Sequence, residues 1–289
     1  METIIFDGHN LAIRCGRAPH LSGLATQAGE PTGEAFGVLH ALATFRKRYA
    51  GQRLLVVWEG SSQHRRAIYP GYKIGKHDAQ SEFGLRFLKE ALPSFGVEQA
   101  HHPQEEADDV IATLIATSKD PSERFVIVST DHDYWQLLSE RVTLLIPPSK
   151  SGGEEKVYDP TTLASEYGVS PERMVDVRAI AGDVSDCIDG IMGFGLKHAS
   201  KAIREYGDLD GLYASDMAKL GPTQRSRIRT FEERVRRNEK LMKLRLLDGV
   251  NVVAAGPDRR VAEAHLRRIG ANQPQILDAF FPAQLNLLG

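Results

Sequence analysis

Four acidic side chains stand together at the start of a predicted helix. Residues 104–115 read QEEADDVIATLI, in which Glu105, Glu106, Asp108 and Asp109 precede apolar residues at helical spacing. Carboxylates in a first helical turn favour the positive end of the helix dipole. The dipole explains Asp108 poorly, because this side chain lies on the apolar face of the helix. A cation site and a solvated helix start are therefore both open for this segment alone.

Acidic residues also follow three short apolar runs. The runs at 3–6, 54–58 and 125–129 read as buried strands. Helical patterns at 33–48, 83–92 and 108–116 separate them, and this alternation predicts an α/β domain with a parallel sheet. Open sheets of this kind bind ligands outside the carboxyl ends of their strands. Each following acid could by itself be a turn residue, an exposed side chain or a helix cap. Their joint placement favours one shared site, formed by Asp7, Glu59, Asp131 and Asp133.

The acids predict a particular class of metal ion. Carboxylates without Cys or His suit Mg²⁺ or Mn²⁺ rather than Zn²⁺. Such a cluster would repel itself without cations, and two ions about 4 Å apart can activate water and stabilise the leaving oxygen of a phosphodiester. Removing nine candidates from the 38 acids leaves 29 against 36 Lys and Arg, a balance of +7 that suits a polyanionic substrate. The nine are Asp7, Glu59, Glu106, Asp108, Asp109, Asp131, Asp133, Asp183 and Asp186.

A glycine-rich turn lies between two later helical patterns. Asp183 and Asp186 precede the sequence GIMGFGLKHASKAI, in which Gly190, Gly193 and Gly195 mark the turn. Glycines allow another backbone to come close, and a helix amino end offers free N–H groups to a phosphate. We therefore expect a hairpin that grips a nucleic-acid backbone. An ordinary helix turn with glycine caps is the alternative.

A basic segment follows the second predicted strand. Residues 61–78 read SSQHRRAIYPGYKIGKHD, and cations interleaved with aromatic rings suit single-stranded nucleic acid. A solvated loop is the alternative reading, which we favour less beside a candidate phosphodiester site. The basic run at 225–245 is weaker evidence, since it also fits an amphipathic helix. The candidate contacts in the first segment are Arg65, Arg66, Tyr72, Lys73 and Lys76.

Length and composition indicate an ordinary globular protein. The 289 residues are 42% hydrophobic and 26% charged, with a net charge of −2. We see no membrane-spanning run or signal segment, and the two cysteines fit a reducing compartment, so we expect a cytoplasmic location. The Pro/Gly/Ser-rich stretch at 147–156 precedes an almost wholly helical pattern. We place an α/β domain at 1–155 and a helical domain at 156–289.

The motifs together resemble the bacterial and phage 5′-nuclease family, to which the amino-terminal nuclease domain of bacterial DNA polymerase I and the flap endonucleases are related. The resemblance spans about residues 1–245 and rests on several unrelated motifs in the same order. It implies a parallel-sheet (PIN-like) nuclease domain with a helical arch at about 61–95 and a helix-hairpin-helix motif at about 175–206. The matching segments are FDGHNLAIR, GEPTGEAFGVL, VVWEG, YPGYK, EEADDVIATL, VSTDHDYWQLL, VYDPTTLASEYGVSPERMVD and AGDVSDCIDGIMGFGLKHASKAI.

The resemblance also implies roles for individual residues. The family's metal-binding acids fall on eight of the nine acids above, and its arch lysine falls on Lys73, so we expect Lys73, Asp7, Asp108 and Asp131 to be catalytic. Backbone carbonyls that hold a monovalent ion, usually K⁺, match Ile180, Ala181, Asp189, Ile191 and Phe194. Further DNA contacts would be Gly193, Gly195, Lys197 and His198. The implied activity is that of a Mg²⁺-dependent 5′–3′ exonuclease and flap endonuclease.

This sequence departs from the family at a few positions. Glu59 stands where relatives usually have Asp, Lys76 where they often have Arg, and Cys187 and Asp189 replace the usual Asn and Pro. The inner acids remain, so we expect a monomeric, stand-alone nuclease with two metal ions, acting on 5′ flaps, nicked or branched duplexes and single-stranded 5′ ends. The alternatives are a DNA-structure binding protein with a degenerate metal site and a small RNA-cleaving enzyme on a similar sheet.

Overall fold

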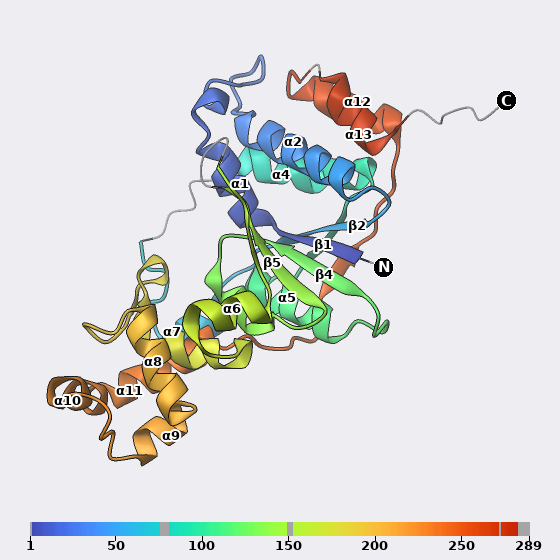
Figure 1. The fold of residues 1–289 in the computed structure, drawn as a ribbon. Helices are drawn as coiled ribbons and strands as arrows, with labels where there is room; N and C mark the ends of the chain where they lie inside the picture. Colours follow the sequence, from blue (N-terminus) through green and yellow to red (C-terminus); the bar gives the residue numbers. More distant parts are fainter. Residues whose placement is uncertain (1, 76–80, 149–152, 272, 283–289) are drawn as a thin grey trace.

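A seven-stranded sheet forms the centre of the computed structural model, which describes residues 2–75, 81–148, 153–271 and 273–282 (Figure 1). Five neighbouring strands run parallel in the order β5, β4, β1, β2, β3, and one antiparallel strand lies at each edge. The parallel sheet predicted from the sequence is therefore confirmed. The strands are β1 (Glu2–Asp7), β2 (Arg53–Trp58), β3 (Glu98–His101), β4 (Arg124–Val128), β5 (Val142–Ile146), β6 (Lys156–Tyr158) and β9 (Asn251–Val253).

The two faces of the sheet bury separate apolar cores. Successive residues of a strand point to opposite faces, so Ile4 and Phe6 pack in one core and Ile5 in the other. Burial on both faces explains why these strands read as continuous apolar runs. The first face is covered by α1 (Gly8–Gly16), α2 (Gly33–Arg48), α4 (Glu82–Ala91), α12 (Arg259–Arg268) and α13 (Pro274–Phe280), and the second by α5 (Ala107–Ala116), η3 (His132–Leu137) and α6 (Pro160–Tyr167) (Figure 1).

Three predicted strands and three predicted helices of the sheet region are present. The predicted helices at 33–48, 83–92 and 108–116 correspond to α2, α4 and α5 within one residue at either end. Strands β3, β5, β6 and β9 were not predicted from the sequence. β6 and β9 have three residues each and β9 is exposed throughout, so neither leaves the apolar signature of a buried strand.

The helical region lies beside the sheet, at the lower left of Figure 1. Between its first two helices is a short hairpin of β7 (Gly182–Asp183), the turn η5 (Val184–Asp186) and β8 (Ile188–Asp189). The helices are α7 (Met174–Ala181), α8 (Leu196–Tyr206), α9 (Leu209–Ala214), α10 (Pro222–Thr230) and α11 (Glu232–Met242). The segment at about 175–206, predicted as a helix-hairpin-helix motif, thus contains α7, this hairpin and α8.

Parts of the chain beyond residue 155 pack with the sheet. β6 pairs with β5 at one edge, and β9 pairs with β3 at the other. Apolar residues of α12 and α13 join the core beneath α2 and α4. The division of the chain at residue 155 stays a prediction, and the structure adds that the sheet recruits segments from both sides of it.

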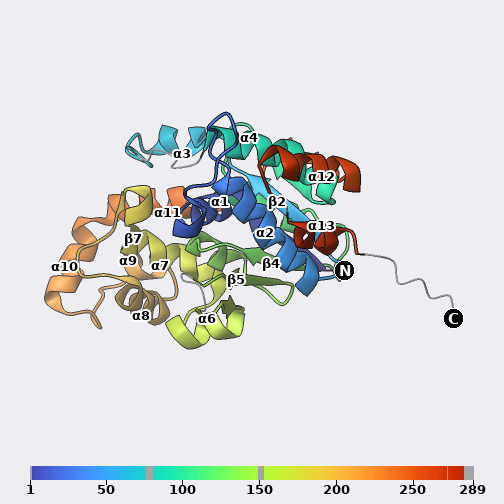
Figure 2. The same ribbon diagram turned by 90° about the horizontal axis from the view of Figure 1, so that it is seen from above.

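The predicted arch segment contains α3 (Gln63–Ile68) and α4. Figure 2 shows α3 at the end of the molecule that also holds α11 and the hairpin. Residues 76–80, which include the predicted DNA contact Lys76, lie outside the described residues. No helix in the described part of the chain is long and apolar enough to cross a membrane.

Candidate active site

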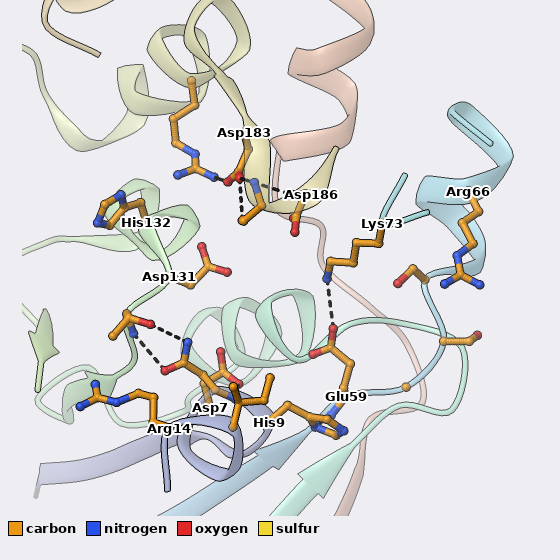
Figure 3. Close-up of a pocket in the computed structure, with 18 of the residues that line it drawn as sticks. Asp7, His9, Arg14, Glu59, Arg66, Lys73, Asp131, His132, Asp183 and Asp186 are labelled. Carbon is orange, nitrogen blue, oxygen red and sulfur yellow. Dashed lines mark hydrogen bonds and ion pairs between the residues drawn. The ribbon is translucent and has the colours of Figure 1, made fainter. Parts of the chain in front are cut away.

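A cavity of about 680 Å³ lies beyond the carboxyl ends of β1, β2 and β4 (Figure 3). The sheet supplies acids at these strand ends because parallel strands all end at one edge. The hairpin between α7 and α8 contributes acids from the opposite side. Five of the nine predicted acids line this cavity: Asp7, Glu59, Asp131, Asp183 and Asp186.

Asp7 joins the first strand to the first helix. Its Oδ1 accepts the backbone N–H of Asn10 at 3.0 Å, which caps α1, and its Oδ2 accepts the hydroxyls of Ser129 and Tyr134, each at 3.2 Å. Burial raises the pKa of Asp7 to about 6, and the nearby charge of Asp131 adds to the effect although these hydrogen bonds oppose it. A cation near this carboxylate would therefore stabilise the folded protein.

Glu59 follows β2 and faces the same cavity. Its backbone N–H donates to Nδ1 of His9 at 3.0 Å, and the N–H of Ala107 at the start of α5 donates to its Oε2 at 3.4 Å. Although 26% of the side chain is exposed, burial raises the pKa of Glu59 to about 7 against the opposing effect of the Lys73 ammonium group. The carboxylate thus favours a positively charged neighbour.

Lys73 supplies that neighbour. Its Nζ lies 3.2 Å from Oε1 of Glu59 and 2.8 Å from Oε1 of Glu106, and only 20% of the side chain is exposed. Burial would lower the pKa of Lys73, but these two carboxylates raise it well above its usual value. Figure 3 shows the side chain pointing from the arch segment toward Glu59. The predicted catalytic lysine therefore lies inside the acidic cluster.

Arg65 occupies the deeper part of this cluster. Its guanidinium group contacts three carboxylates: Nη1 lies 3.1 Å from Glu106 and 2.7 Å from Asp109, and Nη2 lies 3.1 Å from Asp108. Arg65 is 3% exposed, so the structure places it away from the surface where a DNA contact was predicted. Burial raises the pKa of Asp108 well above its usual value, and Arg65 opposes this shift. Glu106, Asp108 and Asp109 do not line the cavity.

A second arginine links the remaining acids. Nη2 of Arg178 donates to Oδ2 of Asp183 at 2.7 Å, while its Nε lies 2.9 Å from Oδ1 of Asp133 as an ion pair without hydrogen-bond alignment. Burial raises the pKa of Asp133 to about 7 despite Arg178. Burial would also raise the pKa of Asp183, but Arg178 and hydrogen bonds from Ser185 keep it below its usual value. Asp133 is buried behind Asp131, which caps η3 by accepting its N–H.

The predicted DNA contacts divide between the surface and the interior. Arg66 is exposed and lines the cavity, and the hairpin residues Gly193, Gly195, Lys197 and His198 are exposed around the start of α8. Tyr72 is 3% exposed, and its hydroxyl bonds Glu106 at 2.8 Å and Asp186 at 3.2 Å. In this structure Tyr72 therefore binds carboxylates of the acidic cluster and is not exposed to solvent.

The predicted monovalent-ion ligands lie around the hairpin, and several of their carbonyls already accept hydrogen bonds. The carbonyl of Ile180 accepts the N–H of Ile191 at 2.8 Å, and that of Ile191 accepts the N–H of Phe194 at 2.9 Å. The carbonyl of Asp189 accepts Nδ2 of Asn238 at 2.9 Å. The five residues thus lie at the end of α7, in β8 and in the turn before α8, and K⁺ binding there stays a prediction.

The donor set fits hard divalent cations. It consists of carboxylate oxygens, which Mg²⁺ and Mn²⁺ prefer, and the protein's own Lys73 and Arg65 already lie among them as positive charges. As these side chains stand, no group of three or more His, Cys, Asp and Glu among the described residues is arranged to hold a metal ion. The ammonium group of Lys73 and the guanidinium group of Arg65 form ion pairs with the carboxylate oxygens that a metal ion would need as ligands.

The structure also reveals basic residues that the sequence analysis did not single out. Arg14 and Arg17, from α1 and the residue after it, line the cavity opposite the hairpin, and Nη2 of Arg14 donates to the carbonyl of Pro148 at 2.8 Å. Arg178 was also missed. Arg14 lies two helical turns after Asp7 in FDGHNLAIR, so a helical reading of this segment would have placed it near the site.

Comparison with known protein families gives two matches along the chain. Residues 2–168 match the profile described as "5′-3′ exonuclease, N-terminal resolvase-like domain". Residues 169–253 match "5′-3′ exonuclease, C-terminal SAM fold". Together the two profiles cover both sides of the cavity.

Curated relatives give a consistent picture. The chain is 34% identical over 243 residues to the thermostable DNA polymerase I of Thermus thermophilus, which covers 83% of this chain and 28% of that protein. It is 33% identical over 212 residues to DNA polymerase I of Mycobacterium bovis, which covers 72% of this chain and 23% of that protein. The chain thus spans less than a third of the length of these relatives.

Solved structures share the fold. A T5 D15 protein co-crystallised with metal ions superposes with a TM-score of 0.66 at 21% identity, covering 97% of both chains. Flap endonuclease-1 from Methanococcus jannaschii superposes with a TM-score of 0.63 at 12% identity, covering 96% of this chain and 92% of that one. At these identities the likeness concerns the fold alone.

Proposed function

Because the chain belongs to the 5′–3′ exonuclease family, we propose that it is a structure-specific 5′ nuclease that hydrolyses phosphodiester bonds of DNA. The observation that carries this proposal is the cavity where Asp7, Glu59 and Asp131 from the strand ends meet Asp183 and Asp186 from the hairpin. Basic side chains line the same cavity, so it combines an acidic centre with a rim suited to phosphates. The substrates would be 5′ flaps, nicked or branched duplexes and single-stranded 5′ ends.

The acids would hold two divalent ions, Mg²⁺ or Mn²⁺. Asp7, Glu59, Asp131, Asp183 and Asp186 line the cavity. Oxygens of Glu59 and of the buried Glu106 would become available to the ions once Lys73 leaves them. Asp108, Asp109 and Asp133 stand behind them, paired with Arg65 and Arg178. When bound, the two ions would supply activation of water and stabilisation of the leaving oxygen.

The remaining parts of the chain would position the DNA. Lys73 would contact the scissile phosphate, and Arg14, Arg17 and Arg66 would attract the backbone into the cavity. The hairpin before α8 would anchor the duplex through backbone N–H groups, with K⁺ as an additional support. We also propose that the enzyme is monomeric and acts in the cytoplasm.

A cleavage assay tests this function. A 5′-labelled flap duplex is incubated with the protein in MgCl₂ or in EDTA, and the products are sized. A matched substrate with an RNA flap serves as the control. Release of the flap only with MgCl₂ supports the proposal. Binding without cleavage would instead support a DNA-structure binding protein with a degenerate metal site.

A further inference from the structure

The ammonium group of Lys73 lies between two carboxylates that come from separate elements. Its Nζ is 2.8 Å from Oε1 of Glu106 and 3.2 Å from Oε1 of Glu59. Glu106 is 2% exposed, so its charge has little access to water and depends on protein partners. One position between the two carboxylates cannot hold both an ammonium group and a divalent ion, because like charges repel strongly at such separations.

We propose that Lys73 is the internal counter-ion of the metal-free protein and that a divalent ion bound by Glu59 and Glu106 releases its ammonium group into the cavity. This inference rests on the proposed function, from which it takes the divalent ion. Lys73 and the metal ion thus compete for the same carboxylates, and the protein supplies its own cation to them until the metal binds.

The backbone around Lys73 is anchored, so release concerns the side chain. The N–H of Lys73 donates to the carbonyl of Asp186 at 3.0 Å, and the hydroxyl of Tyr72 bonds the Asp186 carboxylate at 3.2 Å. Lys73 has a φ of +48°, a left-handed conformation that non-glycine residues rarely adopt, and these contacts hold it there. The long lysine side chain can rotate from this fixed point without movement of the backbone.

The structure offers the released group a place. Lys73 lines the cavity of about 680 Å³, where Arg66 already stands exposed. Arg65 provides a contrast, because three carboxylates and the carbonyl of Leu241 at 2.8 Å hold its guanidinium group at 3% exposure. Of these two cations, Lys73, whose side chain is 20% exposed, is therefore the one that can leave. Once free, it would stand where a phosphate enters.

Reductive methylation of the wild-type protein tests this competition without DNA. The protein is labelled in EDTA and in MgCl₂ at equal ionic strength, and the labelling of each lysine is read by peptide mass spectrometry. Mg²⁺ binding is measured by calorimetry on unlabelled, EDTA-free protein from the same preparation. Lys119, exposed near the amino ends of the strands, serves as the internal control. We expect Lys73 to react about tenfold more slowly than Lys119 in EDTA, and at a similar rate in MgCl₂.

The outcomes separate this inference from the proposed function. Mg²⁺ binding with Lys73 still protected overturns the inference and leaves the nuclease function standing. Absence of Mg²⁺ binding overturns both. Lys73 that reacts as fast as Lys119 in EDTA also overturns the inference, since no counter-ion role would remain.

Substitution gives an independent measurement. Lys73→Met removes the competing charge while keeping the length of the side chain, so Mg²⁺ should bind about tenfold more tightly than to wild type. Lys73→Arg, which keeps the charge, and the control Lys119→Met should leave the affinity close to wild type. Unchanged affinity in folded Lys73→Met would overturn the inference, and if that variant fails to fold, the labelling of the wild-type protein decides.

Discussion

Arg65 holds Asp109 in a buried ion pair, with Nη1 2.7 Å from Oδ2 of the carboxylate. Asp109 is fully buried and Arg65 is 3% exposed, so neither charge reaches water. The pair joins α3 at the base of the arch to the first turn of α5. The acids at the start of α5 therefore have two roles: Glu106 pairs with Lys73, which lines the cavity, whereas Asp108 and Asp109 fix α3 to α5 through Arg65.

Loss of Arg65 should destabilise the protein strongly. Arg65→Met keeps the apolar stem but leaves three carboxylates facing one another without their guanidinium partner. Removing one partner of a buried pair typically costs about 3–5 kcal/mol, and we expect the free energy of unfolding to fall by about this amount in urea titrations. Arg259→Met, which breaks an exposed pair with Asp278, should cost less than about 1 kcal/mol. Equal effects for the two variants would contradict this role of Arg65.

We expect Asp176 to lower the free energy of unfolding at neutral pH. This α7 carboxylate is 6% exposed, and burial together with the charges of Glu239 and Asp208 raises its pKa to about 6 although Arg173 opposes the shift. Between about pH 4 and pH 6 the folded state binds more protons than the unfolded chain, so this contribution to stability falls as pH rises.

Replacing Asp176 should therefore stabilise the protein. Asp176→Asn cannot ionise, and at pH 7 it should be more stable than wild type by about 1–2 kcal/mol. The gain should shrink toward zero near pH 4, where the wild-type carboxyl group is protonated in the folded state. Thermal unfolding of both proteins across this range measures the difference. A pH-independent difference would rule out titration as its cause.

Two hairpin glycines should respond differently to alanine. A Cβ at Gly190 would lie 2.0 Å from the carbonyl oxygen of Ala181, whereas a Cβ at Gly195 meets nothing within 4 Å. Gly190→Ala should lower the melting temperature clearly and weaken duplex binding, because the hairpin backbone must shift. Gly195→Ala should change stability by less than about 1 kcal/mol. Differential scanning calorimetry of the two variants checks this contrast, which equal melting temperatures would refute.

The strand-end acids were predictable for a physical reason. Asp7, Glu59 and Asp131 directly follow buried apolar runs, and parallel strands place their carboxyl ends at one edge. The partner of Glu106, Asp108 and Asp109 was harder to infer. In the sequence, Arg65 reads as a surface cation among other basic residues. In the structure its Nε donates to the carbonyl of Leu241, which lies 176 positions away along the chain. Pairing across such a distance depends on the completed fold, which local spacing does not encode.

The carboxyl-terminal elements show a similar limit. β9 has only three residues, all exposed, and it is a strand because β3 offers it a free edge. α12 and α13 have ordinary amphipathic patterns, which do not indicate the element against which a helix packs. In the structure α13 packs against α2, and α12 packs against η2 (Leu92–Phe95). Local patterns thus indicated that elements exist, and tertiary contacts decided where they lie.

The most direct test of the nuclease assignment uses Asp131, which lines the cavity and caps η3 through a hydrogen bond to the N–H of Asp133 at 2.8 Å. Asn is an equally good helix cap, so Asp131→Asn should keep the fold while removing a charged ligand for the metal. Single-turnover cleavage of a 5′-labelled flap in MgCl₂ should fall at least about 10³-fold, while flap binding measured in CaCl₂ stays near wild type. Cleavage by Asp131→Asn at the wild-type rate would contradict the account.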